Sequence, residues 1–312
     1  MEEPVSWPKA ITLREVGPRD GIQSEQLHVD TGDKIGFIDA LSVTGIRRIE
    51  AVSFVSPKAL PQMADAAEVL AGISRTPGVI YSALVPNRRG ADAAVEARAD
   101  ALQVFMAVTD SYNLKNVNKN VKESLRDVAD VVAVGRAASV PVEGTLSSAF
   151  GDPNEGDVVP ERVVEVSRWM MDEGIDSISY GDTTGMATPR RVRDLIAAVR
   201  EALPGLRLNM HFHDTRGTGL ANVLIALECG IDYFDGSVGG MGGSPFASGA
   251  TGNVVTEDLV HMVEDMGIDT GVDLDALLAA ARIAQSLVSG DLPSHVLRAG
   301  PRDRVDSAGD TA

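Results

Sequence analysis

Residues 207–214 read Arg-Leu-Asn-Met-His-Phe-His-Asp, a short run that we predict to be a β-strand with a polar cluster at its end. Other short runs, rich in β-branched residues, occur along the 312-residue chain, and longer helix-like segments lie between them. Strands that alternate with helices are typical of a parallel sheet joined by crossover helices. The sequence therefore predicts an α/β fold.

The strand and helix units follow one another without a break in composition, which favours a single (β/α)₈ TIM barrel over an open doubly wound sheet. A Rossmann-type sheet would need a Gly-x-Gly-x-x-Gly turn after its first strand, and Gly-Pro-Arg-Asp-Gly at 17–21 does not supply one. We expect a C-terminal helical extension at 273–287, a catalytic domain over 1–290 and a flexible tail over 291–312. The expected strands are 11–16, 46–54, 79–85, 101–108, 140–146, 177–180, 207–212 and 233–237, and the expected helices are 33–41, 63–71, 89–98, 121–138, 160–172, 189–203, 218–228 and 254–266.

The charge balance excludes some classes of partner. A net charge of −17 argues against a nucleic-acid or anionic-membrane surface, because both would repel the chain. Cys229 is the single cysteine, so an intramolecular disulfide and a cysteine-rich metal site are impossible. The start of the sequence lacks a signal-peptide pattern, and no apolar stretch reaches the roughly 20 residues of a membrane span, so we expect a cytoplasmic protein. A local basic pocket for an anionic substrate is still possible, with candidates Arg88, Arg89, Lys115 and Lys119.

His211 and His213 are the strongest indication of a functional site in the sequence. Residues two apart on a strand point to the same side, so both imidazoles can reach one point in a barrel mouth. Asp20, after the first strand, and Asn253, after the eighth, are plausible oxygen partners, because strands one, seven and eight lie close together in a closed barrel. Such a mixed set suits Mg²⁺ or Mn²⁺, or else Zn²⁺ or Co²⁺. The alternative is a chance pair of histidines, with one ring buried and satisfied.

Other polar groups also follow predicted strands, where a barrel places its catalytic residues. Arg19, beside Asp20, could stabilise a developing enolate oxygen; the alternative is an exposed loop pair of little consequence. Asp182 lies between two glycines after the sixth strand, where an ordinary helix cap is the alternative. The glycine-rich run 239–253 suits a loop over an anionic ligand, although it lacks the Gly-Lys-Ser/Thr ending of a phosphate loop.

Seven segments together resemble hydroxymethylglutaryl-CoA lyases, a family of metal-dependent barrel enzymes. The resemblance implies a (β/α)₈ fold and a divalent cation, Mg²⁺ or Mn²⁺, bound by Asp20, His211, His213 and Asn253. It also implies that Arg19 polarises the substrate carbonyl, that Glu50, Asp182 and Glu257 are active-site acids, and that His211 takes part in proton transfer. The implied reaction is a retro-Claisen cleavage of a 3-hydroxy-3-substituted acyl-CoA into acetyl-CoA and a keto acid. The segments are EVGPRDGIQSE (15–25), IEAVSFVSPKALPQMAD (49–65), VPNRRG (85–90), GTLSSAFGDPNEG (144–156), YGDTTGMATP (180–189), NMHFHDTRGTGLANVLIALECG (209–230) and GNVVTEDLVHM (252–262).

Ser244 departs from that family, which has a cysteine at this position of the glycine-rich loop. A thiol has an unperturbed pKa of about 8.5, and a serine hydroxyl is a far weaker acid. Cys229 cannot replace it, because it lies in the helix before the eighth strand. Three outcomes are open: slow cleavage of hydroxymethylglutaryl-CoA, cleavage of a related acyl-CoA, or another reaction of the superfamily, such as that of an aldolase or a condensing synthase. A non-catalytic barrel is the further alternative, and a homodimer is expected from the superfamily.

Overall fold

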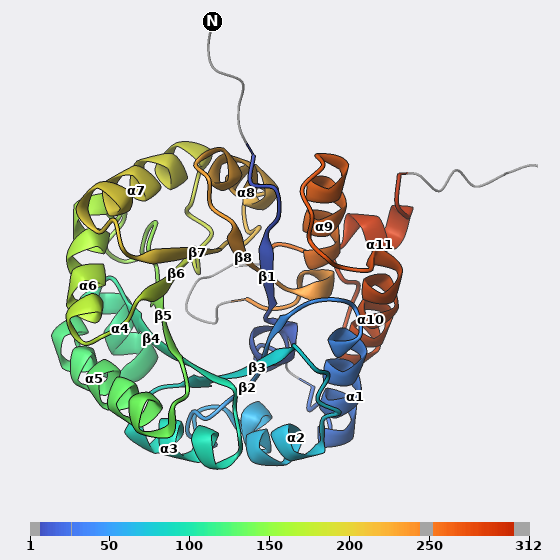
Figure 1. Ribbon diagram of the computed structural model, residues 1–312, viewed down its shortest axis with the longest axis horizontal. Helices are drawn as coiled ribbons and strands as arrows, with labels where there is room; N and C mark the ends of the chain where they lie inside the picture. Colours follow the sequence, from blue (N-terminus) through green and yellow to red (C-terminus); the bar gives the residue numbers. More distant parts are fainter. Residues whose placement is uncertain (1–6, 26, 244–251, 303–312) are drawn as a thin grey trace, which may run out of the picture.

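The computed structural model describes residues 7–25, 27–243 and 252–302, which form one closed barrel of eight parallel strands (Figure 1). The strands pair in sequence order, and the first closes on the last, with Thr12 opposite Tyr233. The predicted TIM barrel and its strands are therefore confirmed. The strands are β1 Thr12–Glu15, β2 Arg48–Ser53, β3 Ile80–Val85, β4 Ala101–Ala107, β5 Val142–Ser147, β6 Ser177–Gly181, β7 Arg207–His211 and β8 Tyr233–Gly236.

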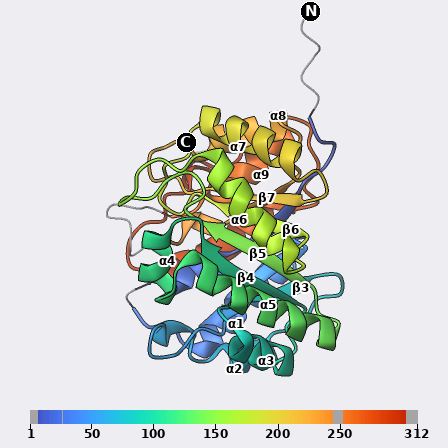
Figure 2. The same cartoon turned by 90° about the vertical axis from the view of Figure 1, so that its left-hand side faces the viewer.

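Helices surround the barrel, as the view along it in Figure 1 and the side view in Figure 2 show. Pro160 and Pro189 occupy the first turns of α6 and α7, where the missing N–H is not needed. Within the described ranges, no helix has both the length and the apolar character to cross a bilayer. The helices are α1 Thr31–Ser42, α2 Ala66–Gly72, α3 Arg88–Glu96, α4 Asp110–Val117, α5 Val121–Ala138, α6 Pro160–Asp172, α7 Pro189–Ala202, α8 Gly219–Glu228, α9 Thr256–Asp265, α10 Leu274–Leu287 and α11 His295–Ala299.

Two helices were not expected. Helix α4 lies before α5, and Asn118 in the left-handed region (φ 56°) separates the two. Helix α11 falls in the segment expected to be a flexible tail from residue 291. Its first turn is bound by Asp258 of α9, whose carboxylate accepts hydrogen bonds from the backbone N–H groups of His295 (3.0 Å) and Val296 (2.8 Å). Residues 303–312 of the expected tail lie outside the described residues.

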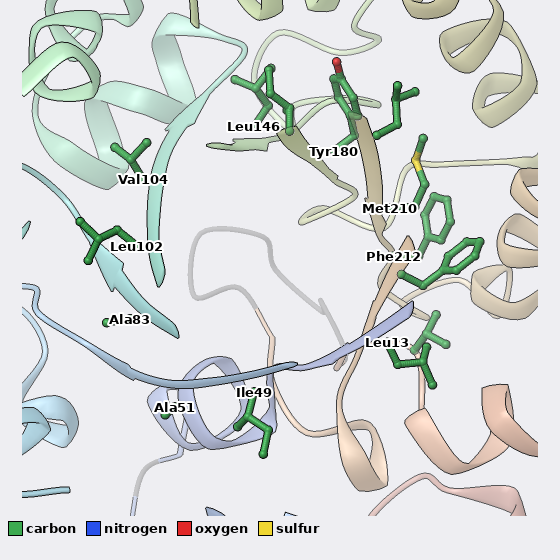
Figure 3. Close-up of a cluster of buried hydrophobic side chains, with 14 of the residues drawn as sticks. Leu13, Ile49, Ala51, Ala83, Leu102, Val104, Leu146, Tyr180, Met210 and Phe212 are labelled. Atoms are coloured by element: carbon green, nitrogen blue, oxygen red, sulfur yellow. The ribbon is translucent and has the colours of Figure 1, made fainter. Parts of the chain in front are cut away.

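The apolar core lies between the strands and the helices. Figure 3 shows side chains such as Leu13, Ile49, Leu146 and Met210 pointing from the strands toward the surrounding helices. Because successive strand residues face opposite sides, their neighbours point into the barrel. The inward neighbour of Leu13 is Arg14, which is only 1% exposed. The barrel interior is therefore polar, and it is this interior that carries the candidate site.

Substitutions at two glycines can test how tightly the connection between α1 and β2 is packed. Gly45, between α1 and β2, has φ +94°, and a Cβ there would lie 2.1 Å from the carbonyl oxygen of Gly271. Gly45→Ala should therefore lower the free energy of unfolding by more than about 1 kcal/mol. Gly36, exposed inside α1 with open space around it, is the matched control. Gly36→Ala should raise stability by about 0.5–1 kcal/mol. Urea unfolding measures both, and a Gly45→Ala protein as stable as the parent would contradict the packing described.

Candidate active site

A single π-helical turn, Gly17–Gly21, follows β1 and carries Arg19 and Asp20 into the barrel mouth. π-Helical turns are rare in proteins, and those that occur are often found at functional sites. The Arg19 guanidinium is bound on two sides: Nε donates to Oε1 of Glu50 (2.7 Å), and Nη1 donates to Oδ1 of Asp20 (2.5 Å). Arg19 is 8% exposed. The exposed loop pair that was the alternative for Arg19 and Asp20 is therefore not what the structure shows, and Glu50 of β2 lies beside them.

His211, at the end of β7, and His213, two residues later, converge as the strand pattern predicted. Their Nε2 atoms lie 3.1 Å apart. Asp20 joins them, so that one ligand atom from each of the three residues lies within 4.8 Å of the other two. Both rings are buried. A carboxylate beside two imidazoles whose lone pairs meet at one point is a possible metal-binding group.

Asn253 completes this group from the segment after β8. It forms an isolated bridge with His213, and its Nδ2 donates to Oδ2 of Asp20 (2.7 Å) and to the carbonyl oxygen of Met241 (3.0 Å). Its Oδ1 is buried and accepts no hydrogen bond from the described part of the chain. An unpaired buried oxygen is costly. Two imidazole nitrogens, a carboxylate and this orphaned amide oxygen fit a divalent cation such as Mg²⁺ or Mn²⁺.

Asp235 of β8 is a site residue that the sequence reasoning missed. Its carboxylate accepts hydrogen bonds from Nε and Nη2 of Arg14 (2.9 and 2.7 Å) and from Nδ2 of Asn209 (2.7 Å), and it lies 3.0 Å from Nδ1 of His211. Burial alone would raise the pKa of Asp235, but Arg14 and His211 hold it well below its usual range. An inward-facing Asp at the centre of the predicted strand 233–237 was the signal that could have identified it.

The contact with Asp235 determines which nitrogen of His211 faces the site. An ionised carboxylate beside Nδ1 keeps the proton on that nitrogen, so the lone pair of Nε2 faces Asp20 and His213. Burial would lower the pKa of His211, but the hydrogen bond and charge of Asp235, with Asp20, raise it. The Asp235 carboxylate therefore orients a candidate ligand through the ring nitrogen that does not face His213.

Asp182 and Glu257, expected as active-site acids, lie behind the site. Oδ1 of Asp182 accepts a hydrogen bond from the backbone N–H of Ala187 (2.8 Å), and both oxygens of Glu257 lie 3.0 Å from the backbone N–H of Gly239. Burial raises the pKa of each carboxyl group to about 7. Neither lines the cavity described below. Ser244, the remaining expected residue, lies outside the described residues.

One cavity of about 570 Å³ opens at the C-terminal ends of the strands, and Asp20, His211 and His213 of the candidate metal group line it. Its wall also includes Arg19 and Glu50. Of the four predicted basic candidates, Lys115 and Lys119 line this cavity, whereas Arg88 and Arg89 do not. Arg88 is exposed and lies 3.8 Å from Asp92 of its own helix.

Glu15, at the end of β1, is a second missed residue. It is fully buried, and its Oε1 accepts hydrogen bonds from the backbone N–H groups of Gly17 (2.8 Å) and Val238 (2.9 Å). Its Oε2 lies 2.6 Å from Oγ1 of Thr256. One carboxyl group thereby joins the turn that carries Arg19 to the turn that follows β8. Burial raises the pKa of Glu15 to about 8.

A closed parallel barrel with this carboxylate–imidazole group at the ends of its strands has the architecture of a TIM-barrel enzyme with a candidate metal site. The protein-family model described as HMGL-like matches residues 10–284. The chain therefore belongs to the HMGL-like family.

Named relatives agree with this assignment. The hydroxymethylglutaryl-CoA lyase YngG of Bacillus subtilis is 44% identical over 94% of this chain and 98% of that protein; the crystal structure of the Bacillus subtilis HMG-CoA lyase is similar with a TM-score of 0.91. The mitochondrial hydroxymethylglutaryl-CoA lyase of Gallus gallus is 47% identical over 88% of this chain and 92% of that protein. An HMG-CoA lyase from Acinetobacter baumannii, in complex with coenzyme A and 3-methylmalate, is 41% identical with a TM-score of 0.91, over 95% of this chain and 97% of that one.

The raised pKa of Glu15 has a measurable consequence for stability. A carboxyl group whose pKa rises from 4.5 to about 8 on folding keeps a proton that the unfolded chain has lost. The free energy of unfolding should therefore fall as pH rises through this window, by about 1.4 kcal/mol per pH unit for one such group. Glu15→Gln mimics the protonated form, because its amide oxygen accepts both N–H groups and its amide nitrogen donates to Thr256.

Near pH 5, Glu15→Gln and the parent should therefore have the same free energy of unfolding. Between pH 5 and pH 8 this free energy should fall less in Glu15→Gln than in the parent, and urea unfolding at several pH values measures the difference. Glu96→Gln, which removes an exposed carboxylate at the end of α3, is the control and should keep the parental slope. An unchanged slope in Glu15→Gln would contradict the protonated state of Glu15.

Proposed function

We propose that this chain is a hydroxymethylglutaryl-CoA lyase that cleaves 3-hydroxy-3-methylglutaryl-CoA, or a closely related 3-hydroxyacyl-CoA, into acetyl-CoA and a keto acid. The observation that supports it most is the convergence of Asp20, His211 and His213 beside a doubly held Arg19, in a barrel of the HMGL-like family. Each named relative is a lyase of this kind. The homodimer and the cytoplasmic location stay predictions.

The reaction breaks the bond between C2 and C3 of the acyl group. The proton leaves the tertiary hydroxyl on C3, the C–O bond becomes a carbonyl, and the electron pair of the broken bond forms the thioester enolate. Protonation of C2 then yields acetyl-CoA. A divalent cation, Mg²⁺ or Mn²⁺, held by Asp20, His211, His213 and Asn253, would supply a Lewis acid that makes the hydroxyl more acidic.

Arg19 is the group suited to the developing enolate charge. Its guanidinium lines the cavity, and its contacts with Glu50 and Asp20 hold it in one orientation before the substrate arrives. A preorganised cation in a site with little water stabilises a developing oxyanion without reorganising during the reaction. Arg19 therefore binds and polarises the thioester carbonyl in this proposal.

His211 is the proposed acceptor of the hydroxyl proton. Glu50 also lines the cavity, but its Oε1 accepts a hydrogen bond from Nε of Arg19 and its Oε2 lies 4.0 Å from Nε of Arg14. An imidazole nitrogen cannot accept a proton while it is a metal ligand, so His211 would accept the proton only when its Nε2 does not hold the cation. Ser244 is the proposed position of the group that returns a proton to C2.

The test is to incubate the purified protein and Mg²⁺ or Mn²⁺ with hydroxymethylglutaryl-CoA and a panel of related 3-hydroxyacyl-CoAs, and to follow acetyl-CoA release. We expect release from at least one thioester. If Ser244 replaces the general acid of the family, Ser244→Cys should raise kcat, since a positioned general acid is typically worth about 10²–10⁴-fold. Release from another panel member alone would assign a different acyl group to this chain. Silence across the panel would contradict the proposal and favour the aldolase or synthase alternative.

Arg19→Gln should lower kcat by about 10²–10³-fold, the usual effect of removing one preorganised oxyanion-stabilising group. Steady-state kinetics with the thioester that the panel identifies measures this loss, and thermal unfolding shows whether the barrel is intact. Arg88→Gln is the matched control, because Arg88 is exposed and does not line the cavity. A folded Arg19→Gln protein with the parental kcat would contradict the role given to Arg19.

A further inference from the structure

Glu143 of β5 is a buried carboxylate in the barrel interior, beyond the wall of the cavity. Arg14 and Asp235 line the cavity, and Glu143 does not. Its side chain accepts hydrogen bonds from four other strands and so joins β1, β2, β4 and β8 to β5 (Figure 1). The donors are Nη1 of Arg14 (3.1 Å), Nη1 and Nη2 of Arg48 (2.9 and 2.8 Å), Nε2 of Gln103 (3.0 Å) and the hydroxyl group of Tyr233 (3.2 Å).

Arg14 is held between two carboxylates by all three of its side-chain nitrogen atoms. Its Nε and Nη2 donate to Asp235 (2.9 and 2.7 Å), and its Nη1 donates to Glu143. A guanidinium group is planar and its donors have a fixed geometry, so a contact at one edge determines the direction of the other edge. Glu143 therefore helps to set the plane in which Arg14 donates to Asp235.

Asp235 transmits this orientation to His211. Its Oδ2 accepts from Nη2 of Arg14 and lies 3.0 Å from Nδ1 of His211. Ser179 and Asn209 also donate to Asp235 (3.1 and 2.7 Å), but both are uncharged, and hydrogen bonds from a charged donor are stronger. A displaced Arg14 would therefore turn Asp235 and weaken the contact that keeps the proton of the imidazole on Nδ1.

Arg48 is the reason why this position needs a negative charge. The guanidinium carbons of Arg14 and Arg48 lie 5.7 and 5.3 Å from the centre of the Tyr233 ring, so two cations share a small part of the interior. Glu143 forms an ion pair with each of them. Like charges repel strongly where little water screens them. Loss of the Glu143 charge should therefore displace Arg14 relative to Asp235.

We propose that Glu143 is a positioning residue for the candidate metal site, and that it acts on His211 through Arg14 and Asp235. This inference rests on the proposed function, because that reaction needs the Nε2 lone pair of His211 in the site. Glu143 does not line the cavity, so it takes no part in the bond cleavage itself.

Nitrogen NMR of the metal-free protein labelled with ¹⁵N-histidine tests this inference without any reaction, because the ring-nitrogen shifts distinguish the two tautomers. At a pH at which the ring is neutral, the parent should carry the proton of His211 on Nδ1. Glu143→Gln should show a second population with the proton on Nε2. It should also bind Mn²⁺ roughly tenfold more weakly, the lower end of the usual effect of changing an outer partner of a metal ligand.

Arg48→Gln is the matched control, because it removes another ion pair of the same carboxylate and leaves the contact between Glu143 and Arg14. It should lower stability to urea but keep the parental tautomer of His211 and the parental Mn²⁺ affinity. Because Glu143→Gln can fail to fold, Arg14→Lys provides a second test. A single ammonium group cannot bind both oxygens of Asp235 and also Glu143, so Arg14→Lys should show the same second tautomer.

Two results would overturn the inference. One is a folded Glu143→Gln protein with the parental tautomer of His211 and the parental Mn²⁺ affinity. The other is an equal change in Glu143→Gln and Arg48→Gln, which would indicate a general loosening of the barrel rather than an effect through Arg14. A changed tautomer in Glu143→Gln alone, in a protein that cleaves no thioester, would support the inference and contradict the lyase proposal.

Discussion

The ion pair between Arg14 and Asp235 is the interaction on which the rest of the barrel interior depends. Both residues are almost completely buried, so each charge would be very costly without the other. Breaking such a pair by removing one partner typically costs about 3–5 kcal/mol. The pair lies where most TIM barrels place layers of branched apolar side chains. The interior of this barrel instead contains charged side chains that are hydrogen-bonded to one another. The candidate site is the part of this network at the C-terminal ends of the strands.

The network leads from the ion pair to the reacting groups in a few contacts. Asp235 orients His211, His211 faces His213 and Asp20, and Asp20 contacts Arg19. Within the described network, three arginines face four carboxylates, so the interior carries an excess negative charge that a divalent cation would offset. These residues are Arg14, Arg19 and Arg48 with Asp20, Glu50, Glu143 and Asp235.

The sequence predicted the barrel well, because strand and helix periodicity are local properties. Helix α6 was predicted with the observed bounds, since Pro160 marks its start. The convergence of His211 and His213 was also predictable, because two residues two apart on a strand share a side. Helix α4 was missed because its eight residues, which include Asn113 and Asn116, have no clear apolar face.

The contacts that could not be predicted join residues far apart in the chain. Glu15 was missed because its partners Val238 and Thr256 meet it only after the barrel closes. Asp182 and Glu257 were expected in the cavity, yet both bind backbone N–H groups behind it, since a motif does not state which way a carboxylate points. The same limit applies to Glu143, whose partners lie on four other strands.

A divalent cation between Asp20, His211, His213 and Asn253, as we propose, would offset the charge of this interior. Electron paramagnetic resonance of Mn²⁺ bound to protein labelled with ¹⁵N-histidine tests it directly. We expect one bound Mn²⁺ per chain, coupled to two histidine nitrogens in the parent and to one in His213→Ala. Asp235→Asn should bind Mn²⁺ more weakly than the parent does. Mn²⁺ that binds without histidine coupling, or that binds His213→Ala as it binds the parent, would contradict a metal site at these four residues.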